Sequence, residues 1–340
     1  MKKWALLVAV LAGCDRAPHP APAPAPPSKG PASAVWKGTL MGSSAGIEVY
    51  GPDQAACDAA VADARAEIER LDVMMTDWKP DSPLMDINKA AGLKPVKVPP
   101  ELLFLVQKSL ELSELTEGAF DISFAGAGKL WNWRAPDPKI PTPEEVRASL
   151  VNVGWKGIVV DEKESTVFLT KPGMRIGLGA IAPGYAGDRA MEKIRAHGIK
   201  DAMVDMSGDL MLIGQKSGEP WKVYINHPRV KDEFVAVIPV SNAAIGTSGD
   251  YERFFIKDGK RYSHIIDPRT GYPADGCQSV TVVAPVLAFA DALAVGLFVL
   301  GPEKGIALAE KMEGVEAMIV GADGKLHVTT GLKGVGPPAK

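Results

Sequence analysis

The sequence contains a nearly unbroken apolar run at residues 286–301, VLAFADALAVGLFVLG, with a single charged side chain, Asp291. A run of this length can form a membrane-spanning helix or a helix buried in a protein core. An ionised carboxylate is costly in either setting unless it is neutralised, paired or bound to a metal. The fold of this segment therefore decides the class of the protein.

The residues around this run favour a buried helix over a membrane span. The preceding segment, SVTVVAP, is β-branched and ends at Pro285, which is typical of a strand. Gly296 interrupts the run, and Gly301 with Pro302 ends it. A central acidic residue also costs about 2.5 to 3.5 kcal/mol on membrane-insertion scales. We therefore expect a helix at residues 287–300 that is buried in a protein core.

Helical and strand patterns alternate between residues 35 and 332 without a repeat or a second linker. Apolar residues three and four apart predict helices at residues 53–75, 100–115, 183–197, 287–300 and 303–312. Strand-like segments read GIVV, TVFLT, DAMVDM, LMLIG, WKVYI, FVAVIPV, ERFFI and SVTVVA. Successive strands without helices between them favour antiparallel pairing. We expect an α+β fold of antiparallel sheets flanked by helices, in a single compact body of one or two lobes.

The N-terminus predicts export. Lys2 and Lys3 precede the apolar residues 4–12, which is typical of a secretory signal. Residues 11–14, LAGC, resemble the lipobox of bacterial lipoproteins, in which the cysteine is acylated and becomes the new N-terminus. This resemblance makes residues 1–13 a lipoprotein signal peptide and Cys14 the lipidated residue.

A tether is predicted between the lipid and the folded body. Residues 14–34 alternate Pro with Ala and favour an extended polyproline II chain of about 3.1 Å per residue. We expect the body to lie on the periplasmic face of the bacterial cell envelope. Asp15 follows the cysteine, an arrangement associated with the inner membrane in enterobacteria. Residues 333–340 are expected to form a flexible tail.

The net charge and the cysteine content bear on the kind of partner and on disulfide pairing. The formal net charge of -3 and the lack of a long basic block argue against a nucleic-acid partner. Of the three cysteines, Cys57 and Cys277 are not assigned to lipid. In an oxidising compartment they could pair, but two cysteines do not define a disulfide framework, so the sequence leaves the question open.

Three segments could carry chemistry, and each has a plainer structural interpretation. Residues 177–194, GLGAIAPGYAGDRAMEKI, place small residues before a helix, which suits a phosphate but also an ordinary turn. His264 and Asp267, in RYSHIIDPRTGYPADG, either face a cleft or lie in tight turns between strands. Phe120 and Asp121, in TEGAFDISFAGAGKLWNW, suit either a planar heterocycle or the edge of the core.

Taken in order, these segments resemble the ApbE-type flavin transferases, which move FMN from FAD onto a Ser or Thr hydroxyl of a target protein. The resemblance spans almost the whole predicted body. It is carried by MGS at residues 41–43 and by MMTDWKPDSPLMDIN, TEGAFDIS, GAIAPGYAGDRA, VDMSGDL, TSGDY, SHIIDPRTGYP and SVTVVAPVLAFADALA. The resemblance implies Mg²⁺-dependent transfer of the FMN moiety of FAD to an acceptor protein, with release of AMP.

The resemblance also implies roles for individual residues. Asp291 and the carbonyl of Ala180 would hold Mg²⁺ against the FAD diphosphate, and His264 would bind the cofactor and assist proton transfer. Other positions would bind FAD, with Trp78 standing where tyrosine is usual: Met41, Trp78, Ala119, Phe120 and Asp121.

The chain departs from the family pattern at three of these positions. Gly177 stands where Asp is usual, and Pro183 where Lys or Glu is usual, both at FAD-binding positions. Val295 stands where a Thr commonly helps to bind the metal, one helical turn after Asp291. Weaker Mg²⁺ binding is therefore expected. Two alternatives stay open: a degenerate member that binds FAD without transfer, and a Mg²⁺-dependent FAD pyrophosphatase.

The acceptor is expected to be another polypeptide. Targets of the family typically carry an Asp-Gly segment a few residues before a Ser/Thr-Gly-Ala-Thr-like sequence, and the chain contains no such segment. By resemblance, the acceptor is a flavin-bearing subunit of a membrane redox complex. The partners expected from the sequence are thus FAD, this acceptor and, through the lipid anchor, the membrane.

Overall fold

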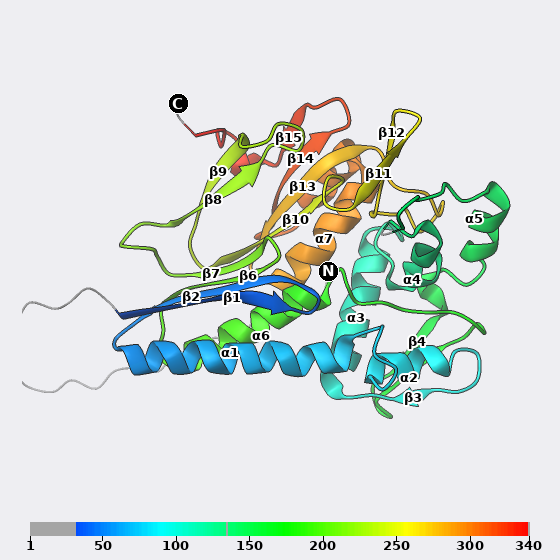
Figure 1. The fold of residues 1–340 in the computed structure, drawn as a ribbon, viewed down its shortest axis with the longest axis horizontal. Coiled ribbons are helices and arrows are strands. Elements are labelled where there is room, and N and C mark those ends of the chain that lie inside the picture. The colour runs from blue at the N-terminus through cyan, green and yellow to red at the C-terminus, as the bar shows by residue number, and fades with distance from the viewer. Residues whose placement is uncertain (1–31, 134, 339–340) are drawn as a thin grey trace, which may run out of the picture.

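The computed structural model describes residues 32–133 and 135–338. An eight-stranded sheet, antiparallel throughout, runs across the molecule in the order β1-β2-β6-β7-β10-β13-β14-β15 (Figure 1). Its strands are β1 (Ala32–Leu40), β2 (Ser43–Gly51), β6 (Asp201–Met206), β7 (Asp209–Ile213), β10 (Ala243–Gly249), β13 (Cys277–Ala284), β14 (Glu316–Gly321) and β15 (Leu326–Val328). This sheet is the frame on which the helices and the candidate site are arranged.

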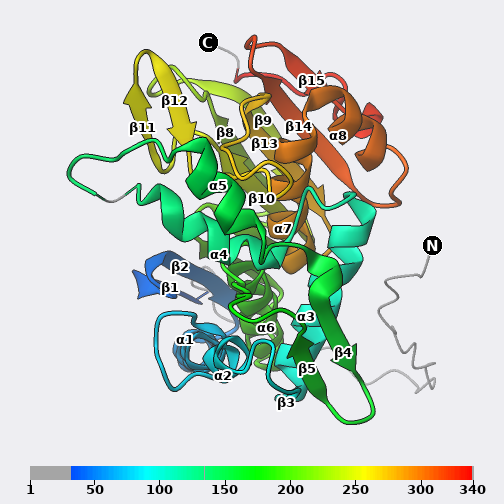
Figure 2. The same ribbon diagram turned by 90° about the vertical axis from the view of Figure 1, so that its right-hand side faces the viewer.

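Three helices cover one face of the sheet (Figure 2). Helix α1 packs on β1 and β2, α6 on β6 and β7, and α7 on β10 and β13. They are α1 (Gln54–Met75), α6 (Ala182–Ala196) and α7 (Leu287–Leu300). The buried residues of these helices share one hydrophobic core with this face of the sheet.

The opposite face of the sheet carries a separate β-hairpin, formed by β8 (Trp221–Asn226) and β9 (Phe234–Val240). Its apolar side chains form a second core with Leu212, Ile245 and Met318 of the large sheet. Successive side chains of a strand point to opposite faces, so Leu212 joins this core while Ile213 joins the first. The molecule therefore has a helix layer, a central sheet and a hairpin layer.

The remaining elements form a lobe beside the sheet and a small projecting hairpin (Figure 1). The lobe contains α2 (Pro83–Lys89), β3 (Val96–Lys97), α3 (Pro100–Leu115), α4 (Ala125–Gly128), α5 (Pro143–Leu150), β4 (Ile158–Asp161) and β5 (Thr166–Leu169). The hairpin consists of β11 (Phe254–Lys257) and β12 (Lys260–Ser263), and α8 (Pro302–Ala309) lies next to β14.

The structure confirms the α+β class and the antiparallel sheets expected from the sequence. The helix predicted at 53–75 forms as α1, and the Asp53 carboxylate accepts a hydrogen bond from Ala56 N–H as its N-cap. Helix α8 ends at Ala309, before the predicted residue 312. Strand β1 begins at Ala32, whereas the folded body was expected to begin at residue 35.

The apolar run forms helix α7 as expected, and it is a core helix. It contacts β10, β13, α6 and α3, which explains why apolar residues occupy all of its sides. No helix within residues 32–133 and 135–338 is both long enough and apolar enough to cross a membrane. The predicted signal peptide, Cys14 and most of the tether lie outside the described residues.

Close packing of α7 on the sheet depends on Gly246 of β10. A Cβ at this position would lie 2.6 Å from the carbonyl carbon of Ala290 and 2.7 Å from the backbone nitrogen of Asp291. Backbone atoms cannot move aside as flexible side chains can. Any larger residue must push α7 away from the sheet.

Gly246→Ala is therefore expected to lower the free energy of unfolding by about 1 to 3 kcal/mol, as overpacked core substitutions do. Gly126→Ala is the matched control, because a Cβ there meets nothing within 4 Å. Urea unfolding of both variants measures the effect. Equal stability of Gly246→Ala and the unchanged protein would contradict the packing described here.

Candidate functional site

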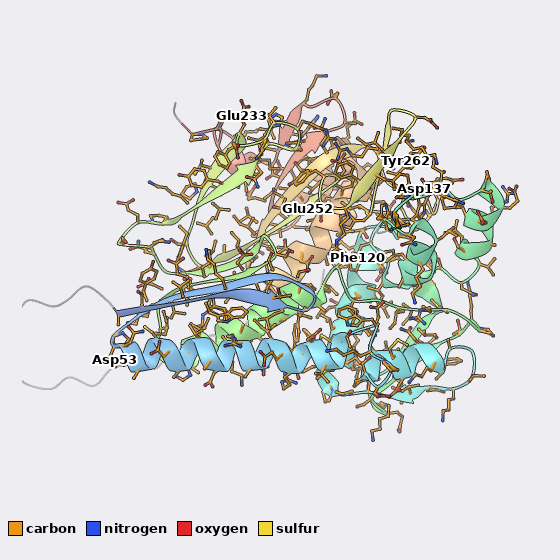
Figure 3. All side chains as sticks on the ribbon, viewed as in Figure 1. Asp53, Phe120, Asp137, Glu233, Glu252 and Tyr262 are labelled. Carbon is orange, nitrogen blue, oxygen red and sulfur yellow. The ribbon has the colours of Figure 1, made fainter. Side chains whose placement is uncertain are left out.

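A cavity of about 540 Å³ lies where several distant segments meet. Its walls come from the β1–β2 turn, the loop after α3, the start of α6, the β6–β7 turn, strand β8, the end of β10 and helix α7. Phe120 and Glu252, two of its lining residues, lie in the middle of the molecule in Figure 3. The cavity is therefore built by the fold as a whole.

Most of the residues singled out in the sequence line this cavity. They are Met41, Ala119, Phe120, Asp121, Gly177, Ala180, Pro183, His264, Asp291 and Val295. Trp78 is not a lining residue. Its side chain is 60% exposed, and its ring lies 3.9 Å from where a Cβ of Gly42 would stand, beside the β1–β2 turn. The structure thus collects ten of these positions in one place and leaves Trp78 at its margin.

A tight hairpin turn presents Met41 to the cavity. Met41 and Gly42 connect the paired residues Leu40 and Ser43, with φ angles of 52° and 73°. Two consecutive positive φ angles define a type I′ turn, which matches the twist of the strands. A left-handed methionine costs about 1 to 2 kcal/mol relative to a right-handed one. The turn keeps this conformation nevertheless, and it places the apolar side chain of Met41 at the cavity.

Asp121 organises the loop that carries Phe120. Its carboxylate accepts hydrogen bonds from the N–H groups of Ser123 and Trp155, both at 2.8 Å. Burial raises the pKa of Asp121, and these hydrogen bonds oppose the rise. Both carboxylate oxygens are used within the loop, so the geometry supports a positioning role for Asp121 at the cavity wall.

Two carboxylates connect helices α6 and α7 reciprocally. Asp188 of α6 accepts the N–H groups of Leu287 and Ala288 at 2.8 and 2.9 Å, at the start of α7. Asp291 of α7 accepts the N–H of Gly184 at 3.1 Å, in the first turn of α6. A Cβ on Gly184 would lie 2.6 Å from the Leu287 carbonyl oxygen, so glycine allows the two helices to approach. Each helix thus supplies an acceptor for the other's free N–H groups.

Two oxygen-bearing residues line the cavity at the start of α6. Gly184 is the third residue of this helix, so its N–H has no acceptor within the helix and donates to the Asp291 carboxylate instead. Pro183 precedes Gly184 and has no N–H that needs a partner. Ala180 and Asp291 both line the cavity. In the described part of the chain no backbone N–H bonds the carbonyl of Ala180, so this carbonyl and the buried Asp291 carboxylate are the candidate ligands at this place.

Oxygen donors of this kind suit a hard cation such as Mg²⁺, which commonly keeps waters and substrate phosphates as its other ligands. Within the described residues, no cluster of three or more His, Cys, Asp or Glu side chains could hold a metal ion by itself. Val295, one turn after Asp291, lines the same cavity and has no donor atom. The residues fit a cation that shares its coordination with a bound anionic ligand.

Asp209, which carries no role in the sequence-based predictions, lies in the same cavity wall. Its carboxylate accepts the N–H of Thr247 at 2.8 Å. Burial, and then the nearby charge of Asp291, raises the pKa of Asp209 well above its usual value. The pairing of β7 with β10 brings Asp209 here, and no local sequence pattern reveals that pairing. Asp209 adds acidic character to this end of the cavity.

His264 lies at another part of the wall. Its backbone N–H donates to the Arg253 carbonyl at 2.9 Å, while its ring Nδ1 is buried and has no partner within residues 32–133 and 135–338. Burial, reinforced by the charge of Arg253, lowers the pKa of His264 to about 4. The ring is therefore neutral at pH 7 and can accept a hydrogen bond or a proton from a ligand.

Other residues singled out in the sequence take structural positions. The Asp267 carboxylate accepts Arg269 Nε and Nη2, both at 2.8 Å, and the Arg269 backbone N–H at 2.9 Å, so it stabilises its own turn. Cys57 and Cys277 are both buried and free. The sequence left open whether these two cysteines form a disulfide, and in the structure they do not pair.

Comparison with known proteins finds one matching family and several relatives that share one name. Residues 41–319 match the sequence profile of the ApbE family. The chain is 33% identical to the FAD:protein FMN transferase of Treponema pallidum over 310 residues, covering 86% of each chain. It is 32% identical to that of Vibrio cholerae over 333 residues, covering 95% of each.

Solved structures show the same fold. The crystal structure of the ApbE protein from Thermotoga maritima matches with a TM-score of 0.82 and 32% identity, covering 88% of this chain and 98% of that one. The flavin transferase ApbE from Vibrio cholerae matches with a TM-score of 0.81 and 30% identity, covering 90% and 99%. The similarity extends over nearly the full length of both solved chains.

The buried Asp291 makes stability depend on pH. Burial, and then the charge of Asp188, raises the pKa of Asp291 to about 7 in the folded protein, against about 4 for an ordinary Asp. A raised acid pKa stabilises the fold below the unfolded pKa, and this contribution is lost as pH rises through 7. In EDTA, Asp291→Asn should therefore unfold at a higher temperature than the unchanged protein at pH 8, by about 3 °C.

The difference in unfolding temperature between Asp291→Asn and the unchanged protein should widen from pH 5 to pH 8, because the amide of the substituted side chain accepts the Gly184 N–H without becoming charged. Exposed Asp81 supplies the control, and Asp81→Asn should shift neither midpoint. Calorimetry at both pH values measures the effect. A gap of the same size at pH 5 and pH 8 would contradict it.

Proposed function

The chain belongs to the ApbE family, and from this premise we propose that it is an FAD:protein FMN transferase. It would transfer the FMN moiety of FAD to a Ser or Thr hydroxyl of an acceptor protein and release AMP. The observation that carries the proposal is the single cavity in which ten predicted site positions, distant in sequence, come together. Near-full-length identity above 30% to relatives of that name supports the same activity.

The reaction needs little covalent chemistry from the protein. The acceptor oxygen bonds to the FMN-side phosphorus, the anhydride bond to the AMP phosphate breaks, and AMP leaves with the bonding electrons. Positioning and charge neutralisation account for most of the catalysis in phosphoryl transfers. The glycine-lined entry to α6 can provide the positioning, and a cation held by the acidic residues facing it would provide the charge neutralisation.

We propose Mg²⁺ as the cofactor, held by the Ala180 carbonyl and the Asp291 carboxylate. When bound, the ion would neutralise charge on the FAD diphosphate as the phosphorus is attacked. The presence of Ala180 and Asp291 in one cavity wall and the raised pKa of Asp291 support this assignment, because a buried carboxylate with no basic partner among the described residues favours a cation. Val295 lacks the hydroxyl oxygen that threonine commonly supplies to the metal at this position in the family.

His264 is proposed to handle the proton of the acceptor hydroxyl. Its ring is neutral at pH 7 and its buried Nδ1 lacks a partner among the described residues. A hydroxyl that enters the cavity could donate to this nitrogen as its oxygen bonds to phosphorus. Met41 and Phe120 provide apolar surface at the wall against which a flavin or adenine ring can pack.

The cellular setting is also a proposal, and it rests on the sequence of residues 1–34. We propose a lipid anchor at Cys14, a tether that holds the body on the periplasmic face of the inner membrane, and an acceptor that belongs to a membrane redox complex. The start of β1 at Ala32 supports a folded body that follows directly after the tether.

Incubation with FAD, Mg²⁺ and an acceptor peptide carrying the Asp-Gly and Ser-Gly-Ala-Thr elements tests the activity. The peptide should gain the mass of FMN with an equal amount of AMP, and Asp291→Ala should lower the rate at least about 100-fold. AMP without a peptide adduct would establish the pyrophosphatase instead. FAD binding with neither product would leave only the degenerate, non-transferring member.

Val295→Thr should strengthen the metal site because it restores a hydroxyl donor one turn from Asp291. The affinity for Mn²⁺ in the presence of FAD, measured by electron paramagnetic resonance, should rise about tenfold. Val295→Ala, which removes bulk without adding oxygen, should leave the affinity unchanged. An equal gain in both variants would show that space, and not the donor, limits binding.

A further inference from the structure

Strand β8 presents an open edge to the cavity. Among residues 32–133 and 135–338, it pairs only with β9, in a two-stranded sheet. Four consecutive residues of β8, residues 223–226, all line the cavity. Side chains of a strand alternate between two faces, and here Val223 and Ile225 are buried while Tyr224 and Asn226 are exposed. One face cannot present all four residues, so the cavity borders the backbone edge of the strand.

The register of the hairpin identifies the backbone groups at this edge. Tyr224 lies opposite Val237, whose N–H donates at 3.0 Å to the carbonyl of Gly336 and so points away from β8. Opposite residues of an antiparallel pair direct their backbone groups either both inward or both outward. Tyr224 therefore directs its N–H and C=O away from β9, to the side of the cavity.

The adjacent outward pair agrees with this register. Lys222 lies opposite Pro239, which has no N–H to donate and fits only where the groups point outward. Outward groups thus alternate along β8 at Lys222 and Tyr224. Of these two residues only Tyr224 lines the cavity.

The two edges of the β8–β9 hairpin differ in their hydrogen bonding. The outer edge of β9 is closed by the Gly336 carbonyl at Val237 and lacks a donor at Pro239. In the described part of the chain, no backbone hydrogen bond closes the edge of β8 at Tyr224. Open edges are templates for another strand, and proteins commonly cover or blunt those that have no use.

We propose that the edge of β8 at Tyr224 binds the acceptor polypeptide as an added, extended strand. This rests on the proposed function, which requires a polypeptide segment at the cavity. An N–H and a C=O on one residue, both directed outward, match the paired groups of an extended chain. Side chains of the added strand alternate, so a Ser or Thr can face the cavity while its neighbours face away. Acceptors would then be recognised largely through their backbone.

Proline substitutions test the role of the backbone. Tyr224→Pro removes the N–H that faces the cavity but no hydrogen bond to β9. It should raise the KM for the Ser-Gly-Ala-Thr peptide about tenfold, through one lost hydrogen bond and the bulk of the ring at the edge. The Kd for FAD, followed by flavin fluorescence, should not change. An unchanged KM, or a loss of FAD affinity instead, would overturn the proposal.

Two control variants separate the backbone from other effects. Lys222→Pro makes the same change at the outward position that does not line the cavity, and its KM should stay within about twofold of the unchanged protein. Tyr224→Ala keeps the N–H but removes the ring, which packs at 5.0 Å from that of Phe234. Because the backbone N–H remains, its rise in KM should be less than half of that in Tyr224→Pro. A rise in KM as large in either control as in Tyr224→Pro would overturn the proposal.

Hydrogen exchange supplies a readout that does not depend on transfer. A peptide with Ala in place of the acceptor Ser should slow amide exchange in residues 221–226, whereas FAD alone should not. This result can be obtained even if the protein fails to transfer FMN, so the proposed function and the added strand can fail separately. Exchange unaltered by saturating peptide would contradict strand addition.

Discussion

Helices α6 and α7 are connected by two carboxylates, the buried Asp291 and the half-buried Asp188, each of which accepts backbone N–H groups from the other helix. Asp188 caps α7, and Asp291 takes the Gly184 N–H from α6. The second bond holds Asp291 at the start of α6, beside the cavity that Ala180 also lines. The contact that connects the helices therefore fixes the carboxylate at the place where we propose that a cation binds. A bound cation would offset the cost of burying Asp291.

The large sheet brings the other parts of the site to this corner. Gly246 lets β10 approach α7 closely, and the pairing of β10 with β7 places Asp209 in the same wall. On the far side, β8 borders the cavity with its backbone edge. A nucleotide held between α6 and α7 and a polypeptide added at β8 would then meet in one space. In the proposed arrangement, the helix layer binds the nucleotide and the hairpin layer binds the acceptor.

The sequence predicts those parts of the fold that local patterns encode. Regular apolar spacing predicts α1 and α3, and the flanking Pro285 and Gly301 predict the ends of α7. Strand β10 was not predicted, because AAIGTSG consists mostly of small residues without a clear strand pattern, and its two neighbours in the sheet make it a strand. Short elements such as α2 escape for a similar reason, since a seven-residue helix offers too few turns for a clear period.

The site shows the same limit. Family resemblance identifies the residues that line the cavity, but the side chain of Trp78 lies outside its wall and the Asp121 carboxylate is used by its own loop. Asp188 and Asp209 receive no role from sequence, because their partners lie far along the chain and meet them only after helix crossing and strand pairing. Long-range hydrogen bonds, which leave no local pattern, decide what these carboxylates do.

The central claim is that Asp291, held by the Gly184 N–H, forms a cation site together with the Ala180 carbonyl. A crystal structure with FAD and Mn²⁺, with data collected at the manganese absorption edge, tests it most directly. The anomalous map should show one ion bonded to the Ala180 carbonyl oxygen, the Asp291 carboxylate and the FAD diphosphate, with Gly184 N–H still donating to Asp291. An ion bound elsewhere, or a Gly184 N–H bonded to the Ala180 carbonyl, would contradict the account.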